Sequence, residues 1–346
     1  MMFLWYGSTF KSYFLMLKTA KRITYIDSLK AFAMFLVVLG HSGLPEDSTI
    51  RSLIYSFHIP FFVFLSGLFA KTPNSLSESL KKSFFTLVVP YLFFSLLLIP
   101  FEFMSHLLEP GGGISLDSLQ YKLLMDDKYS CGPIWFLGAL LIIKLVFNCL
   151  GVLLKRTAPN KEKFKAVVLL SFVALIYYLD LKSIISLLSV DTAIALFPFY
   201  LSAWLFKNYI FERFRLPRHV LFGLLILFAF LSVANGYIDF DQMKLGDNLI
   251  VTFLTALIGC VVFFYFGYLY LNDKNFYKIE NMGEYSIGIL GLHIVIIQPL
   301  RWLYKYTIDY TIPLWYLFFI SCLTFYLSFR ITLLIIKVNP KLLGKV

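Results

Sequence analysis

Long apolar runs, each close to the length of a membrane-spanning helix, recur along the chain and are separated by short polar stretches. A helix crosses the hydrocarbon core of a bilayer with about 20 residues. The runs do not alternate apolar and polar positions, as the strands of a membrane β-barrel do. The pattern therefore predicts an all-α, polytopic bundle of about ten transmembrane helices. The predicted spans are residues 26–42, 52–70, 83–105, 134–154, 166–180, 192–208, 219–236, 248–271, 284–300 and 313–336.

Composition supports an integral, multi-pass membrane protein. Of the 346 residues, 59% are hydrophobic and 15% are charged, and the mean hydropathy is +0.78. A soluble chain is about 25% charged, so a water-soluble globule is excluded. The cysteines are scattered without a CxxC pair, which predicts neither a disulfide framework nor a metal site. They are Cys131, Cys149, Cys260 and Cys322.

The basic residues predict the orientation of the bundle. The net charge of +11 is spread between the apolar runs, so we expect membrane lipid and no nucleic acid as a partner. Ten spans place both termini on one side, where 21 of the 31 Lys and Arg residues also fall. Cytoplasmic loops carry the excess of positive charge, so both termini are predicted to be cytoplasmic. Residues 1–24 then form a cytoplasmic interfacial segment, 25–338 the membrane domain and 339–346 a cytoplasmic tail.

Ionisable side chains inside the first two predicted spans are the first candidates for function, because such groups are costly in hydrocarbon. Lys30 and His41 are eleven residues apart, which returns to nearly the same helix face, roughly 16 Å along the axis. His58 precedes Pro60, which removes a backbone donor and is expected to kink the second span. His41 and His58 are therefore predicted to face each other at similar depth.

Two further residues are candidates for substrate binding. His293 lies near the middle of the ninth predicted span. Trp135 opens the fourth span near the outer interface, where it fits either an aromatic belt or a platform for a sugar ring. Buried histidines also serve as packing residues, and as proton relays in transporters or flippases, so transport is the alternative function. A structural subunit is a third class.

Several stretches resemble the membrane-bound acyltransferase family 3. Asp27-Ser28-Leu29-Lys30, Gly40-His41-Ser42 and the segment FHIPFFVFLSG at 57–67 resemble its opening. Val89-Pro90-Tyr91, Pro133 to Leu137, Tyr285-Ser286 and Leu292-His293 follow in the family's order. Lys30 stands where many members carry arginine, which is similar to the fucose 4-O-acetylase-like branch.

The resemblance implies transfer of an acyl group, usually acetyl from cytoplasmic acetyl-CoA, to a hydroxyl of a cell-surface polysaccharide unit or its lipid-linked precursor. It implies a bacterial inner membrane and no permanently bound cofactor. His41 is implied as general base or transient acyl acceptor, His58 as its orienting partner or a second acid, and Lys30 as a contact for coenzyme A phosphates. Peptidoglycan, a membrane lipid and a small metabolite stay open as acceptors.

Overall fold

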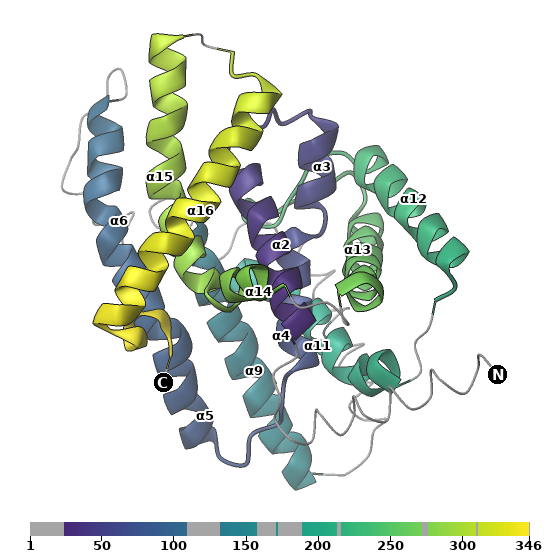
Figure 1. Cartoon of the computed structure of the whole chain (residues 1–346). Coiled ribbons are helices and arrows are strands. Elements are labelled where there is room, and N and C mark those ends of the chain that lie inside the picture. The colour runs from purple at the N-terminus through teal and green to yellow at the C-terminus, as the bar shows by residue number, and fades with distance from the viewer. Residues whose placement is uncertain are drawn as a thin grey trace.

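The computed structural model describes residues 24–108, 132–157, 171, 189–212, 216–271, 276–308 and 311–345. These residues form a helical bundle with one small antiparallel hairpin, β1 (Ile238–Asp239) and β2 (Lys244–Leu245) (Figure 1). The helical prediction is confirmed, and the hairpin is an addition to it. The α-helices are α2 (Thr24–Gly40), α3 (Thr49–Tyr55), α4 (His58–Leu68), α5 (Leu76–Ser83), α6 (Val89–Leu108), α9 (Trp135–Thr157), α11 (Val190–Glu212), α12 (Arg218–Ala234), α13 (Leu249–Leu271), α14 (Tyr277–Glu284), α15 (Ser286–Thr307) and α16 (Leu314–Val338).

Among the described residues, six helical stretches have the length and apolar composition of a membrane span. They are Thr49–Leu68, Leu76–Phe101, Gly132–Val152, Leu249–Leu271, Ser286–Thr307 and Leu314–Val338. Helices α2, α11 and α12 occupy the first, sixth and seventh predicted spans. The fifth predicted span lies outside the described residues except for residue 171, as does the segment 1–23. Ten crossings and cytoplasmic termini therefore stay predictions.

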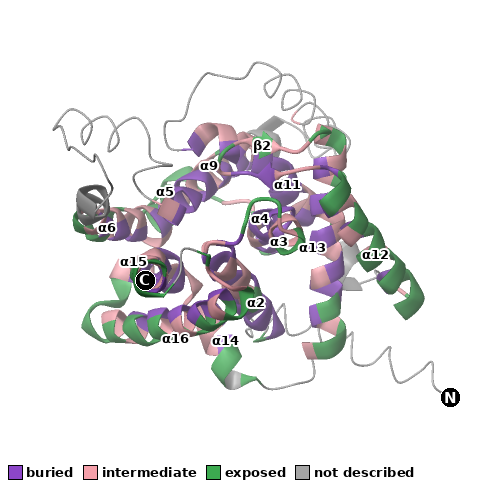
Figure 2. Cartoon of the chain, turned by 90° about the horizontal axis from the view of Figure 1, so that it is seen from above, coloured by how far each residue is buried: buried purple, intermediate pink, exposed green. Residues whose placement is uncertain are grey.

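The outer faces of the bundle are apolar. Leu96 on α6, Phe222 on α12 and Trp315 on α16 are 68%, 64% and 68% exposed. Figure 2 shows exposed residues along the outward sides of α12 and α16 and buried residues toward the interior. Water would penalise so much exposed apolar surface, whereas lipid chains do not. The fold is therefore that of an integral membrane protein.

Glycines let the central helices approach closely. A Cβ atom on Gly67 of α4 would lie 2.1 Å from the carbonyl oxygen of Tyr200 on α11. A Cβ atom on Gly283 of α14 would lie 1.7 Å from the carbonyl oxygen of Asp27 on α2. Small residues permit such backbone contacts between membrane helices. These contacts hold α2 and α4, the helices nearest to His41 and His58, in the interior.

The second predicted span is broken rather than kinked. Helix α3 ends at Tyr55, and α4 begins at His58 after Ser56 and Phe57. Pro60 falls in the first turn of α4, where a backbone N–H has no partner within the helix in any case. The expected kink at Pro60 is thus replaced by a break just before it.

The start of α2, the start of α15 and the C-terminal residues lie at one end of the molecule. Asp27 is beside Gly283, Lys345 forms an ion pair with Glu284, and its Nζ lies 3.7 Å from the centroid of the Tyr285 ring. The 3₁₀ turn η4 (Pro340–Leu343) packs against α6 and α16. This shared end agrees with the predicted common side of these segments.

Candidate active site

A cavity of about 380 Å³ lies at the opposite end of α2, where the α3–α4 break, the start of α9, the hairpin and α15 converge. A volume of this size suits a small substrate or one part of a larger one. Its polar and aromatic lining residues are His41, Glu46, Arg51, Tyr55, His58, Trp135, Asp239, Asp241, Gln242 and Arg301.

His41 and His293 are neighbours at this cavity. His41 directly follows α2, and the centroid of its ring lies 5.2 Å from that of His293 on α15. Nδ1 of His293 lies 2.9 Å from the carbonyl oxygen of Leu290 and 3.1 Å from that of Ile289. A carbonyl only accepts, so Nδ1 donates, and Nε2 of the neutral ring carries the lone pair. That Nε2 is buried and has no hydrogen-bond partner among the described residues.

His58 has the same tautomer. Its Nδ1 lies 2.7 Å from the carbonyl oxygen of Ile54, near the end of α3. The break between the helices brings this carbonyl within reach of the first residue of α4. The ring of His58 lies edge-on to Tyr55, with 5.1 Å between centroids. In the neutral ring of His58, the lone pair is therefore on Nε2, as in His293.

Arg51 links α3 to the hairpin segment. Its Nη1 donates to the carbonyl of Leu44 at 3.1 Å, and its Nη2 donates to the hydroxyl of Tyr237 at 2.5 Å. The guanidinium carbon lies 4.6 Å from the centroid of the Tyr55 ring. The Tyr237 hydroxyl in turn donates to Oδ2 of Asp239 at 2.9 Å. These contacts fasten the hairpin over one side of the cavity.

Burial shifts the pKa values of Tyr237 and Asp239, the two titratable residues of the hairpin segment that take part in this link. Burial raises the pKa of Tyr237 to about 12, and the nearby carboxylate of Asp239 acts in the same direction. Burial also raises the pKa of Asp239, while hydrogen bonds from Tyr237 and from the backbone N–H groups of Asp241 and Gln242 oppose that rise. Near neutral pH the link therefore has a neutral phenol hydroxyl as donor.

Removing the Tyr237 hydroxyl is expected to loosen the hairpin. In Tyr237→Phe, Arg51 and Asp239 lose their bridging group, and a hydrogen bond to a charged group contributes about 1.5–3 kcal/mol. We expect trypsin to cleave after the exposed Lys244 several-fold faster in the purified protein. Tyr306→Phe, at a 65% exposed tyrosine, is the matched control. Equal cleavage rates in both variants contradict the bridging role.

Arg301 on α15 also lines the cavity and has fewer partners among the described residues than Arg51. Its Nη1 donates to Oε1 of Gln298 at 3.1 Å, and its buried Nε has no hydrogen-bond partner within the described part of the chain. Within the described residues, no carboxylate lies within 4.0 Å of its guanidinium. Gly43 packs against it, since a Cβ atom there would lie 2.8 Å from both Nε and Nη2. The positive φ of Gly43, 103°, also favours glycine at this place.

Comparison with known proteins identifies the family. A family model described as an acyltransferase domain matches residues 23–333. The chain belongs to this acyltransferase family. No curated protein and no solved structure matches it significantly. The matched range contains every residue that lines the cavity, so the acyltransferase carries the cavity within its family domain.

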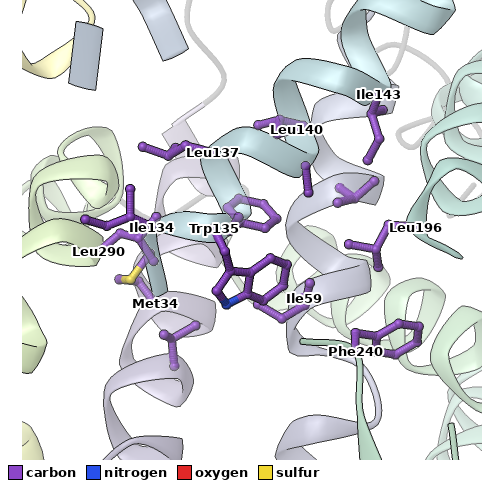
Figure 3. Close-up of a cluster of buried hydrophobic side chains, with 14 of the residues drawn as sticks. Met34, Ile59, Ile134, Trp135, Leu137, Leu140, Ile143, Leu196, Phe240 and Leu290 are labelled. Carbon is purple, nitrogen blue, oxygen red and sulfur yellow. The ribbon is translucent and has the colours of Figure 1, made fainter. Parts of the chain in front are cut away.

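The acyltransferase brings four of the five predicted site residues together. His41 and His58 line the same cavity, as predicted, and His293 lies beside His41. Trp135 is only 3% exposed and lines the cavity, so it does not belong to a lipid-facing aromatic belt. Figure 3 shows its ring between Met34 and Ile59. Contact of Trp135 and His293 with substrate stays a prediction.

Lys30 lies away from the cavity. Its Nζ pairs with Oδ1 of Asp27 at 3.2 Å, near the start of α2, whereas His41 follows the last residue of that helix. The eleven residues between Lys30 and His41 correspond to roughly 16 Å of helix. A donor that contacts Lys30 must therefore reach along α2 to meet His41.

The sequence interpretation did not single out Arg51 or Arg301. A usable signal was present in their spacing from the histidines. Arg51 precedes His58 by seven residues, and Arg301 follows His293 by eight. In an unbroken helix, spacings of about two turns place side chains near one face, which applies to Arg301 and His293 on α15 but not across the break between α3 and α4. The contact between the hairpin and Arg51 has no comparable local signal.

Proposed function

We infer that this acyltransferase moves an acetyl group from cytoplasmic acetyl-CoA to a hydroxyl of a cell-surface polysaccharide unit or its lipid-linked precursor, in a bacterial inner membrane. Acyl transfer follows from the family. The resemblance of the motifs around Lys30, His41 and His58 supports the donor, the acceptor and the membrane. The observation that carries the proposal is the pair His41 and His293, whose rings meet at the cavity wall.

His41 is proposed as the general base. Its imidazole takes the proton from the acceptor hydroxyl while that oxygen attacks the carbonyl carbon of the thioester. The C–S bond of the tetrahedral intermediate then breaks, and the departing coenzyme A thiolate takes the proton from the imidazolium. The acetyl group is now an ester of the acceptor, and His41 is neutral again.

His293 is proposed as a positioning residue for His41. Its Nδ1 is fixed by backbone carbonyls, which leaves the buried Nε2 as a lone-pair acceptor next to the His41 ring. An acceptor at that place orients an N–H of His41 and stabilises the imidazolium that forms during transfer. His58, with its own Nε2 lone pair, supplies a second such group at the cavity.

The separation of Lys30 from the cavity supports a reaction with two-sided access. Met34, Val37 and Val38 are buried on α2 between Lys30 and His41. The phosphates of coenzyme A would bind at the Lys30 end of α2. The acyl group, at the end of the long and thin arm of coenzyme A, would lie along the buried residues between Lys30 and His41. The acceptor then enters the cavity from the side of the hairpin.

Two substitutions at His293 test its positioning role. In His293→Asn, the amide nitrogen still donates to the carbonyls of Ile289 and Leu290, but no group replaces Nε2 of the imidazole. In His293→Gln, the amide oxygen lies where Nε2 was and can accept a hydrogen bond. We expect His293→Asn to lower kcat about tenfold or more with little change in KM for acetyl-CoA, and His293→Gln to lose less. Equal kcat values in the two variants contradict the role assigned to Nε2.

The reaction is tested with membranes that contain the wild-type protein, acetyl-CoA labelled in the acetyl group and envelope glycan from the native host. We expect label in the glycan, and none with membranes that lack the protein. Longer acyl-CoA donors, supplied in parallel, identify the acyl group. Label that moves only from a longer donor overturns the acetyl assignment, and no transfer from any donor overturns the proposed reaction.

A further inference from the structure

We propose that Arg301 binds a negatively charged group of the acceptor, a phosphate or a carboxylate, so that the enzyme selects anionic acceptors. The proposal rests on the proposed function, because it concerns the substrate of the same cavity. It adds to that function a negative charge on the acceptor and the residue, Arg301, that recognises this charge.

The two arginines of the cavity differ in how their charges are balanced. Arg51 has Glu46 at 3.8 Å, donates to Tyr237 and Leu44, and interacts with Asp239. Among the described residues, Arg301 has one side-chain hydrogen bond, to a neutral amide, and no carboxylate within ion-pair distance. A partly buried charge without a counter-charge is costly. An anion in the cavity relieves that cost at Arg301 and not at Arg51.

The unused donors of Arg301 lie on one edge of its guanidinium. Nη1 is engaged by Gln298, which leaves Nε and Nη2. These two nitrogens present parallel N–H groups, the arrangement that binds two oxygens of a phosphate or carboxylate. A Cβ atom at residue 43 would lie 2.8 Å from both nitrogens, so glycine lets the chain pass close beside this edge, and both Gly43 and Arg301 line the cavity. The edge therefore has unused donors at the wall of the cavity.

The position of Arg301 favours the acceptor over the donor as the source of the anion. Arg301 packs against Gly43, two residues after His41, and both His41 and Arg301 line the cavity. The phosphates of coenzyme A belong to the Lys30 end of α2 in the proposed reaction. The negative groups that line the cavity are Glu46, Asp239 and Asp241. Glu46 and Asp239 interact with Arg51, and among the described residues none of the three carboxylates forms an ion pair with Arg301.

The test compares three acceptors in proteoliposomes, which share the same lipid and the same ring hydroxyl groups on the sugar. One acceptor has a phosphate between sugar and lipid, one has a neutral linkage, and one has the neutral linkage and a uronic acid in place of the neutral sugar. We expect kcat/KM of the wild type to be about tenfold or more higher for at least one anionic acceptor, as loss of a charge-assisted contact predicts. The preferred anionic acceptor identifies phosphate or carboxylate as the recognised group.

Arg301→Gln is expected to abolish this preference by raising KM for the anionic acceptor, while KM for acetyl-CoA stays unchanged. Arg301→Lys keeps part of the preference, since it retains the charge but not the paired donors. Arg218→Gln, at an exposed arginine on α12, is the matched control and keeps the full preference. Wild-type transfer that is equally efficient to neutral and anionic acceptors overturns the proposal, as does an unchanged preference in Arg301→Gln. If the wild type acetylates none of the three acceptors and no envelope glycan, the proposed function itself fails.

Discussion

Replacing His41 with alanine is expected to lower acetyl transfer by about 10²–10⁴-fold, the contribution of a general base positioned at the reacting hydroxyl. The side chain lines the cavity and lies next to His293, and no other described histidine occupies its place at the end of α2. The measurement is incorporation of labelled acetyl into envelope glycan by membranes with equal amounts of each protein. The loss is expected in kcat, because a general base, the role proposed for His41, acts on the reacting atoms.

His219→Ala is the matched control for this experiment, because His219 is an exposed histidine at the start of α12. We expect wild-type transfer in this variant. Transfer above half of the wild-type rate in His41→Ala contradicts the assigned role. Label that remains on the wild-type protein without acceptor, and is absent from His41→Ala, identifies His41 as a transient acyl acceptor rather than a base. Proton-coupled flux without consumption of acetyl-CoA supports the transporter alternative.

Replacing Gly67 with alanine is expected to cause a large loss of stability, because the added methyl group meets the backbone of a neighbouring helix. The added carbon would lie 2.1 Å from the carbonyl oxygen of Tyr200, so α4 and α11 must separate by more than 1 Å to restore ordinary contact. Overpacking of this kind costs about 1–3 kcal/mol or more, and here it meets backbone rather than a flexible side chain. The midpoint of thermal unfolding in detergent is expected to fall by several degrees.

Gly223→Ala provides the control, because no atom of the described residues lies within 4 Å of the added Cβ on α12. This exposed helix position is expected to tolerate alanine without loss, since alanine favours the helical backbone over glycine. A Gly67→Ala protein that unfolds at the wild-type temperature contradicts the close approach of α4 and α11. Since α4 begins at His58, Gly67→Ala is also expected to lower acetyl transfer.

The amino-acid sequence by itself determined that this is a membrane protein, where most of its helices lie, and that His41 and His58 lie close to each other. Apolar runs near 20 residues predict helices, because the backbone N–H and C=O groups of a segment in lipid must form their hydrogen bonds within that segment. The separation of Lys30 from His41 followed from helix geometry alone. The meeting of His41 and His58 at one cavity followed from the short connection between two neighbouring helices.

Only the tertiary structure decided which distant residues complete the site. His293 lies beside His41, although about 250 residues separate them in the chain, and Arg51 meets Tyr237 across a gap of 186 residues. Apolar membrane helices lack a polar face that marks their outward side, so their sequences do not show which face packs inward. The faces that pack inward are fixed by close helix contacts, such as those at Gly67 on α4 and Gly283 on α14, where only a glycine fits. Arg301 directly follows the ninth predicted span, yet it lies against Gly43 at the cavity, a contact that only the tertiary structure shows.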